Sequence, residues 1–154
     1  MKIMGRSGIP DILQFKRLLR DKNLKATPQR MAVHEAMWNL VHASADDVAA
    51  WIAEHGTARI SPASVYNILT LLAGLGIYGR RSARGGKMVF DGRVGPHLHL
   101  YDTESEAWRD LEDEEMMQWL EAHLKGKRYR GYRIDGFEVQ LLCHPSRKGT
   151  VRKA

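Results

Sequence analysis

The triplet His97-Leu98-His99 is the sharpest local signal for chemistry in the sequence. In an extended strand, residues two positions apart point to the same face, so both imidazoles can bind one metal ion. Two solvent-facing histidines on an edge strand are the alternative, and the motif by itself leaves that alternative open. Asp91 is close enough in sequence to reach the same ion. Further candidate ligands, which spacing alone does not place, are His42, Asp110 and His123.

The elements that must position these side chains belong to a basic protein whose charge is unevenly distributed. The net charge is +6, and residues 1–95 contain 14 Lys and Arg against 7 Asp and Glu, whereas residues 96–154 contain 10 against 11. A lobe with such an excess of positive charge attracts a polyanion, and DNA is the usual one. A solvated basic surface explains the same charge, so charge alone does not decide between the two.

Length and composition limit the class of protein. The chain has 154 residues, of which 44% are hydrophobic, enough for one compact unit or for two small lobes that need packing between lobes or subunits. Its single cysteine, Cys143, cannot form an internal disulfide and favours a reducing compartment. No apolar run approaches the roughly 20 residues that span a bilayer, and no apolar signal core begins the chain. We therefore expect a cytoplasmic protein with no membrane contact.

Helix signals dominate the first part of the chain. Residues 10–22 carry apolar side chains at helical spacing. Thr27-Pro28 and Ser61-Pro62 each combine a capping hydroxyl with a proline at the first helical position, which predicts two helix starts. A further helix start is predicted at Ser44, which lies between these two in the chain and is followed by Asp46 and Asp47 in the first turn. The apolar stripe of the last of these helices comprises Val65, Ile68, Leu69, Leu72 and Leu75.

A basic hairpin is predicted directly after these helices. Residues 77–81 and 87–91 read as short strands, and Arg84-Gly85-Gly86 supplies the turn. Helices followed by a basic hairpin predict a winged helix, whose fourth helix enters the major groove of DNA. That helix by itself is equally well explained as an ordinary amphipathic helix with a polar outer face. The basic wing beside it favours DNA binding. Its outward positions are Ala63, Asn67 and Thr70, with Tyr66 on the flank.

The second part of the chain reads as a smaller mixed lobe. The composition shifts at residues 92–96, which predicts a hinge; strands are expected at 97–101, 108–111 and 137–143, and a helix at 112–125. A homodimer would bury the exposed sheet edge and helix face of such a lobe. The predicted fold class is α+β, with an N-terminal winged-helix DNA-binding domain and a small C-terminal α/β dimerisation domain. The predicted domains are residues 1–91, a hinge at 92–96, residues 97–145, and a disordered basic tail at 146–154.

Four segments, in register along the chain, resemble the ferric uptake regulator (Fur) family. Residues 24–30, LKATPQR, resemble the family's "R-x-T-P-Q-R", and residues 42–48, HASADDV, resemble "H-P-T-A-D-D-I". Residues 60–69, ISPASVYNIL, are similar to the recognition helix "S-x-A-T-V-Y-x-x-L". Phe90-Asp91 followed by His97-Leu98-His99 is similar to "F-D…H-x-H". The resemblance extends from about residue 13 to residue 143, and it implies a homodimeric repressor that binds double-stranded operator DNA.

The resemblance also implies one regulatory metal site per subunit, built from three histidines and two carboxylates. Such donors suit Fe²⁺ or Mn²⁺, with Zn²⁺ possible in the purified protein. One ion bound by ligands from both lobes would favour the interlobe angle that fits DNA. The helix histidine His123 matches a family position that is not a ligand. The implied ligands are His42, Asp91, His97, His99 and Asp110.

DNA contacts are predicted on the fourth helix, the wing and the start of the second helix. Tyr66 and Asn67 should face the groove, and the wing cations should meet phosphates. The complete predicted set is Arg30, Ser61, Ser64, Tyr66, Asn67, Thr70, Arg80, Arg81 and Lys87.

Two positions favour the peroxide-sensing (PerR-like) branch of the family. Asp110 stands where iron-uptake repressors usually carry Glu, and Asn67 stands where they more often carry Arg. In that branch, bound Fe²⁺ reacts with hydrogen peroxide and a ligand histidine is oxidised; by resemblance, these are His42 and His97. An iron-responsive repressor of iron uptake is the alternative. A non-haem iron enzyme is the alternative of another class, but few strands and a helical first half disfavour it, so no enzyme activity is expected.

The main departure from the family concerns a structural zinc. Relatives carry two C-x-x-C pairs, whose positions here hold Asp102 with Ser105 and Cys143 with Ser146. A closed zinc site needs about four competent ligands, and a serine hydroxyl is a poor one. We therefore predict no structural zinc, with packing of Tyr101, Trp108 and Trp119 in its place. A winged-helix protein that senses no metal is a third reading, but it leaves the aligned histidines unexplained.

Overall fold

The computed structural model describes residues 2–4, 8–56 and 58–146, and the chain divides into two compact units. The first unit is Arg6–Val94, and the second joins Gly95–Ala154 to Met1–Gly5. The boundary therefore falls inside the predicted hinge at residues 92–96, whereas Lys2–Met4 belong to the second unit rather than to the predicted DNA-binding domain. No helix in the described part of the chain is long and apolar enough to cross a membrane.

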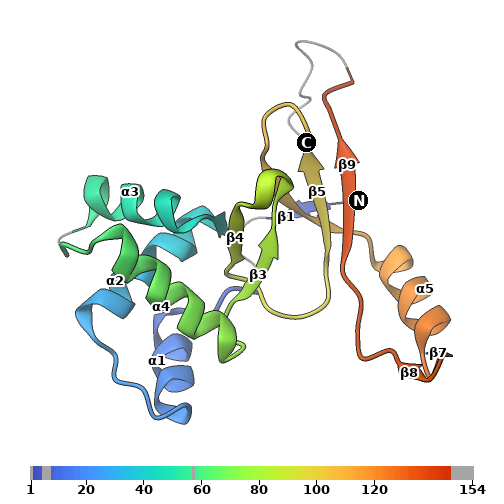
Figure 1. Cartoon of the computed structure of the whole chain (residues 1–154), viewed down its shortest axis with the longest axis horizontal. Coiled ribbons are helices and arrows are strands. Elements are labelled where there is room, and N and C mark those ends of the chain that lie inside the picture. The colour runs from blue at the N-terminus through green and yellow to red at the C-terminus, as the bar shows by residue number, and fades with distance from the viewer. Residues whose placement is uncertain (1, 5–7, 57, 147–154) are drawn as a thin grey trace. The chain divides into compact units, whose positions relative to one another are not determined.

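The first unit is mainly helical (Figure 1). Its helices are α1 (Ile12–Asp21), α2 (Pro28–Leu40), α3 (Ala45–His55) and α4 (Pro62–Gly74). The hydroxyls of Thr27, Ser44 and Ser61 each accept a hydrogen bond from the amide three residues later, which satisfies one free amide at each helix start. The predicted helix starts are thus confirmed. At α1, Asp11 caps the helix by accepting from the amides of Leu13 and Gln14.

A small sheet completes the first unit, in the order β2 (His42–Ala43), β4 (Met88–Asp91), β3 (Gly79–Ser82) among the described residues. The predicted wing is confirmed, but β3 begins two residues later than expected, because the amides of Ile77 and Tyr78 donate to the Leu72 carbonyl in the last turn of α4. The turn between β3 and β4 holds Gly85 at φ 82° and Gly86 at φ 81°, backbone angles that glycine adopts readily. The sequence did not predict β2.

The helices enclose one apolar core. Fully buried residues come from every helix of the unit and from the strand β4, so the core fixes the helices against the wing. The predicted stripe of α4 is largely confirmed, because Val65, Leu69 and Leu72 are fully buried, whereas Ile12 at the start of α1 is 47% exposed. The core comprises Phe15, Leu19, Val33, Ala36, Met37, Ala43, Val48, Ile52, Val65, Leu69, Leu72, Ile77, Tyr78 and Phe90.

A buried histidine, His34, lies within this core. Its ring stacks on Phe15, with 3.9 Å between ring centroids. Nε2 lies 2.9 Å from the Pro10 carbonyl oxygen, and Nδ1 lies 2.8 Å from the Tyr78 hydroxyl. A carbonyl only accepts, so Nε2 donates and Nδ1 accepts from the tyrosine. Burial lowers the pKa of His34 from 6.5 to about 4, and burial also raises the pKa of Tyr78.

We predict that His34 makes the free energy of unfolding depend on pH. Its pKa is lower in the folded than in the unfolded protein, so the unfolded state binds a proton first as the pH falls. Stability should be complete above pH 6.5 and should fall by on the order of 3 kcal/mol towards pH 4. Denaturant unfolding across this range checks it. In His34→Gln, this fall in the free energy of unfolding towards pH 4 should be absent. In His55→Gln, at an exposed site on α3, the fall should remain. An unchanged pH profile in His34→Gln would contradict the prediction.

The second unit is built on a mixed sheet. Among the described residues its order is β1 (Lys2–Met4), β6 (Trp108–Glu112), β5 (Leu98–Asp102), β9 (Val139–Cys143). The β5–β9 pair is parallel and the other two pairs are antiparallel. The three predicted strands are confirmed, whereas β1 was not predicted. Its pairing with β6 is the reason why the start of the chain belongs to this unit.

One helix, α5 (Glu114–Leu124), follows β6. It confirms the helix predicted at residues 112–125 but is shorter at both ends. None of its residues is fully buried, and Trp119 is 61% exposed. Met116, Leu120 and Trp119 line a groove with Val139 of β9. An apolar face of this kind is what a subunit contact would cover, so the homodimer interface stays the prediction here.

Candidate metal centre

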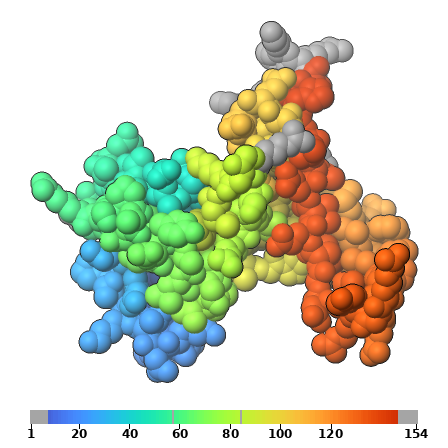
Figure 2. Space-filling model, in the orientation of Figure 1, coloured from blue at the N-terminus to red at the C-terminus, as the bar shows by residue number. Residues whose placement is uncertain are grey.

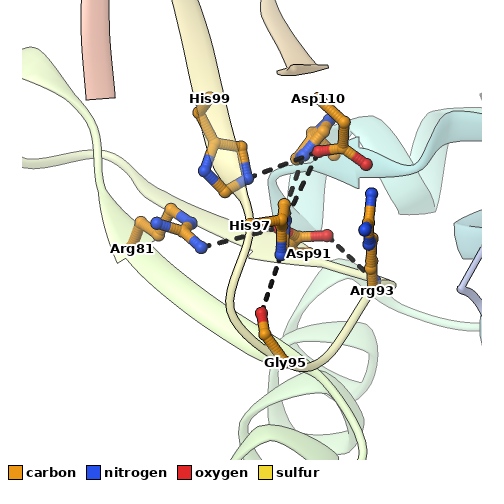
Figure 3. A network of polar contacts seen from close by, with 8 residues as sticks. Arg81, Asp91, Arg93, Gly95, His97, His99 and Asp110 are labelled. Carbon is orange, nitrogen blue, oxygen red and sulfur yellow. Dashed lines mark hydrogen bonds and ion pairs between the residues drawn. The ribbon is translucent and has the colours of Figure 1, made fainter. Parts of the chain in front are cut away.

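Two buried histidines and one buried aspartate converge in the second unit. His97 precedes β5, His99 lies within it, and Asp110 is the cross-strand partner of His99 on β6. The Nε2 atoms of His97 and His99 each lie 3.4 Å from Oδ1 of Asp110. Figure 3 shows both imidazoles turned towards this carboxylate. The strand register therefore brings together three of the predicted ligands.

The geometry of this trio fits a divalent ion. Its ligand atoms lie within 4.8 Å of one another, and its side chains are at most 3% exposed. Donors about 2.0–2.2 Å from one ion lie roughly 3–3.5 Å from each other. Nδ1 of His97 lies 2.8 Å from the Gly95 carbonyl oxygen, which only accepts. The proton therefore sits on Nδ1, and Nε2 presents its lone pair towards the carboxylate, as a metal ligand must.

The first unit holds the other two predicted ligands as a second buried pair. His42 on β2 is the cross-strand partner of Asp91 on β4, with 3.4 Å between Nε2 and Oδ2. Their side chains are 6% and 1% exposed. The amide of Arg93 donates to Oδ1 of Asp91 at 2.9 Å, and the Arg81 guanidinium lies 3.8 Å from Oδ2 (Figure 3). These contacts fix the orientation of the carboxylate.

The backbone just before His42 adopts an unusual conformation. Val41 has φ 66° and ψ −59°, a region that a β-branched residue rarely occupies. Its amide donates to the Met37 carbonyl at 2.9 Å, and its carbonyl accepts from the Gly92 amide at 2.9 Å. Such conformations cost on the order of 1–3 kcal/mol and persist where the surroundings fix them. These two hydrogen bonds therefore hold the backbone at the junction between α2 and β2, where His42 begins the strand.

His123, the remaining histidine among the candidate ligands, lies apart from the other donors of the second unit. It is exposed on α5, where its ring stacks on Trp119 at 5.0 Å and its Nε2 lies 3.1 Å from the Lys127 amine. These contacts account for the residue without a metal, in agreement with its predicted role outside the ligand set.

The residues predicted to contact DNA are unequally exposed. Tyr66 is 47% exposed on α4 and packs edge-on against Phe90, while Asn67 is exposed beside it. Arg81 differs from the other wing cations, because its side chain is only 14% exposed and lies against Asp91. Arg30 donates to the Lys25 carbonyl at 2.8 Å. Also exposed are Ser61, Arg80 and Lys87, and half-buried are Ser64 and Thr70.

A hydrogen-bonded turn occupies the positions at which relatives carry their first cysteine pair. The Ser105 hydroxyl donates to Asp102 at 2.7 Å, and with the Glu104 amide at 2.9 Å it holds the pKa of Asp102 below its usual value. Thr103 connects this turn to β9, because its amide and its hydroxyl both donate to the Cys143 carbonyl, at 2.8 and 3.1 Å. Hydrogen bonds thus join the segments that the cysteine pairs of relatives would join.

We predict that the second unit needs no tightly bound metal for its stability. The experiment uses His97→Ala, which removes a predicted regulatory ligand, so that a change on adding chelator reports only a second metal site. The melting temperature of this variant should be the same with and without a strong chelator, because hydrogen bonds and apolar packing hold the unit. Zinc retained at one equivalent per chain after dialysis against chelator would contradict this prediction.

Comparisons with known proteins agree with this architecture. The model of the ferric uptake regulator family matches residues 21–140. No curated protein shows significant sequence similarity to the chain. The manganese-containing ferric uptake regulator from Pseudomonas aeruginosa is similar in structure, with a TM-score of 0.69 and 24% identity over 86% of this chain and 98% of that one.

Two further solved structures show the same fold. The ferric uptake regulator of Vibrio cholerae has a TM-score of 0.65 and 22% identity, covering 85% of this chain and 99% of its own. The peroxide stress regulator of Campylobacter jejuni has a TM-score of 0.63 and 25% identity, covering 90% and 99%. The predicted fold class, α+β with an N-terminal winged helix and a small C-terminal α/β unit, is confirmed. The chain belongs to the ferric uptake regulator family of metal-responsive transcription regulators.

Proposed function

We propose that this protein is a repressor that binds operator DNA as a homodimer when loaded with metal, and that hydrogen peroxide ends repression by oxidising its ligand histidines. The observation that carries the proposal is the buried trio of the second unit, in which His97 and His99 each lie 3.4 Å from Asp110. Buried imidazoles beside a buried carboxylate are costly without a cation, which supports a resident divalent ion.

The proposed site takes one ion per subunit, bound by ligands from both units: His42, Asp91, His97, His99 and Asp110. The support is that each unit already holds its own share of the donors at ligand spacing. An ion bound by both sets would stabilise the arrangement of the units that binds DNA, by the difference in its affinity for that arrangement and for others. The donor set suits Fe²⁺ or Mn²⁺, and Zn²⁺ would also bind.

Peroxide would act on the imidazoles of His42 and His97. Bound Fe²⁺ would catalyse the reaction of hydrogen peroxide with a ligand ring, which supplies the electrons, and Mn²⁺ in the same ligands would not. One peroxide oxygen would replace a ring C–H with C=O, the hydrogen would move to a ring nitrogen, and the other oxygen would leave as water. The ring would thereby lose two electrons. Because the Gly95 carbonyl orients His97, the damaged ring would stay in place as a poorer donor.

The peroxide-sensing branch is favoured over iron sensing by two residues. Asp110 and Asn67 differ from the residues usual in iron-uptake repressors. An iron-responsive repressor of iron uptake is the candidate that replaces this proposal if the test below fails.

DNA recognition would follow the winged-helix pattern of the family. The exposed Tyr66 and Asn67 of α4 would contact base edges, and the exposed Arg80 and Lys87 of the wing would contact phosphates. Arg81 would act mainly by orienting Asp91, because of its burial. Supporting backbone contacts are proposed for Arg30, Ser61, Ser64 and Thr70.

Peptide mass spectrometry after mild peroxide treatment tests the proposal. The Fe²⁺-loaded protein should gain one oxygen at His42 or His97 and should lose operator binding in parallel. The Mn²⁺-loaded protein should show neither change. The exposed His55 and His123 are internal controls and should stay unmodified in both forms. If the iron form loses DNA binding while His42 and His97 are intact, the iron-repressor function should replace the peroxide-sensing one.

A further inference from the structure

A short basic hairpin follows α5 in the second unit. It consists of β7 (Arg128–Tyr129) and β8 (Tyr132–Arg133), which pair only with each other among the described residues. Figure 1 places it at the C-terminal end of α5, and Figure 2 shows this orange segment open on the viewed face. Residues 125–133 contain no acidic residue and five cations, which are Lys125, Lys127, Arg128, Arg130 and Arg133.

The hairpin has a defined geometry. Arg130 at φ 49° and Gly131 at φ 86° form a two-residue turn with both central residues left-handed, the kind that joins tightly twisted strands. Arg128 is the cross-strand partner of Arg133, and Tyr129 is the partner of Tyr132. Directly opposed residues share a face, so the two arginines lie on one face and the two tyrosines on the other.

Folding alone does not account for all of this charge. Lys125 and Lys127 follow the C-terminus of α5, where cations are favourable, and the Lys127 amine contacts His123. Arg133 pairs with Asp135 at 3.3 Å, but both side chains are more than three-quarters exposed. Arg128 and Arg130 form no ion pair within the described ranges. Opposed like charges destabilise a hairpin, and Asp135 pairs with Arg133 alone, so the Arg128 charge still opposes folding unless a further anion lies over it.

The tyrosines do not hold the hairpin by burial either. Tyr129 is 51% exposed and Tyr132 is 76% exposed. An isolated two-stranded hairpin is at best marginally stable in water. Charge repulsion on one face and exposed rings on the other therefore indicate a surface that is adapted to a ligand rather than to the core.

We propose that this hairpin is a second DNA-contacting element, which binds the phosphate backbone of double-stranded DNA without regard to sequence. Guanidinium groups match phosphate oxygens bidentately, and tyrosine hydroxyls also donate to phosphates. A two-stranded ribbon is narrow enough to enter a major groove. The inference rests on the DNA binding of the proposed function, but on neither its metal site nor its peroxide response.

The test is the salt dependence of binding to a duplex that lacks an operator, using the full-length protein. Each lost phosphate contact reduces the magnitude of the negative slope of log affinity against log salt by about 0.9. Arg128→Gln and Arg130→Gln should each reduce this magnitude by about one, and the double variant by about two. Arg109→Gln removes an exposed arginine of β6 in the same unit and should leave the slope unchanged.

A wing variant separates this inference from the proposed function. If the double variant Arg80→Gln, Lys87→Gln leaves the slope unchanged, the proposed contact of the wing with DNA is wrong. The hairpin variants would still decide whether the hairpin contacts DNA, because their effect on the slope is measured separately. Unchanged slopes in both single hairpin variants would overturn the inference. Weaker binding only to single-stranded oligothymidine would overturn it in favour of base stacking on the tyrosines. A changed oligomeric state with an unchanged slope would overturn it in favour of a subunit contact.

Discussion

Replacing His97 with alanine is expected to abolish the stimulation of DNA binding by metal. Loss of a residue that merely orients a ligand already weakens metal affinity about 10–100-fold, so loss of a ligand should weaken it at least about 100-fold. His97 is 3.4 Å from Asp110 and fixed by Gly95, so a neighbouring side chain cannot easily take its place. Titration of metal into the protein, followed by operator binding, measures the effect.

The matched control is His123→Ala, which removes an exposed histidine of the same unit and should leave metal affinity unchanged. Asp91→Ala, which removes a proposed ligand of the first unit, should also abolish the stimulation of DNA binding by metal, because the proposed ion needs donors from both units. Operator affinity of His97→Ala in chelator that equals that of metal-loaded wild-type protein would refute the regulatory site. An effect of His97→Ala without one of Asp91→Ala would confine the ion to the second unit.

Replacing Asn67 with alanine should remove much of the preference for the operator. A side-chain amide that contacts a base edge with two hydrogen bonds contributes about 1–3 kcal/mol to discrimination, which is roughly 5–150-fold in relative affinity. Affinity for unrelated duplex DNA should be unchanged, because Asn67 carries no charge. Competition between operator and non-operator duplexes measures the ratio.

The control for this variant is Asn39→Ala, at an exposed position near the end of α2. It should leave the competition ratio unchanged. If Asn67→Ala weakens binding equally for all duplexes, Asn67 contacts the backbone rather than the bases, and Tyr66 becomes the better candidate for reading sequence.

Local chemistry explains why most of the first unit could be predicted. The caps at Thr27, Ser44 and Ser61 act within four residues, so the sequence around each contains the whole signal. The same is true of the glycine turn between β3 and β4. Strand β2, by contrast, is only two residues long and exists because His42 pairs with Asp91, far along the chain. No local periodicity can indicate such a pairing.

The candidate ligands show the same division. The spacing of His97 and His99 indicates a shared face, and this could be read directly from the sequence. Asp110 joins them through the register of β5 and β6, which spacing does not determine. Family resemblance supplied that residue, and the structure places it beside both histidines. The burial of Arg81 and the contacts of His34 depend on tertiary packing, which leaves no local signal in the sequence.

The left-handed Val41 has a consequence for how this protein can evolve. Selection for thermal stability alone would favour glycine at this position, because glycine adopts φ 66° without strain. Glycine would also let the chain before His42 sample other directions, and ordering one residue costs about 1–2 kcal/mol of backbone entropy. That entropy would then be lost when the ion is captured rather than when the protein folds. On the proposed function, in which His42 is a ligand, a stabler descendant carrying glycine would need more free metal to respond, and Val41 would help to set the metal concentration at which the regulator acts.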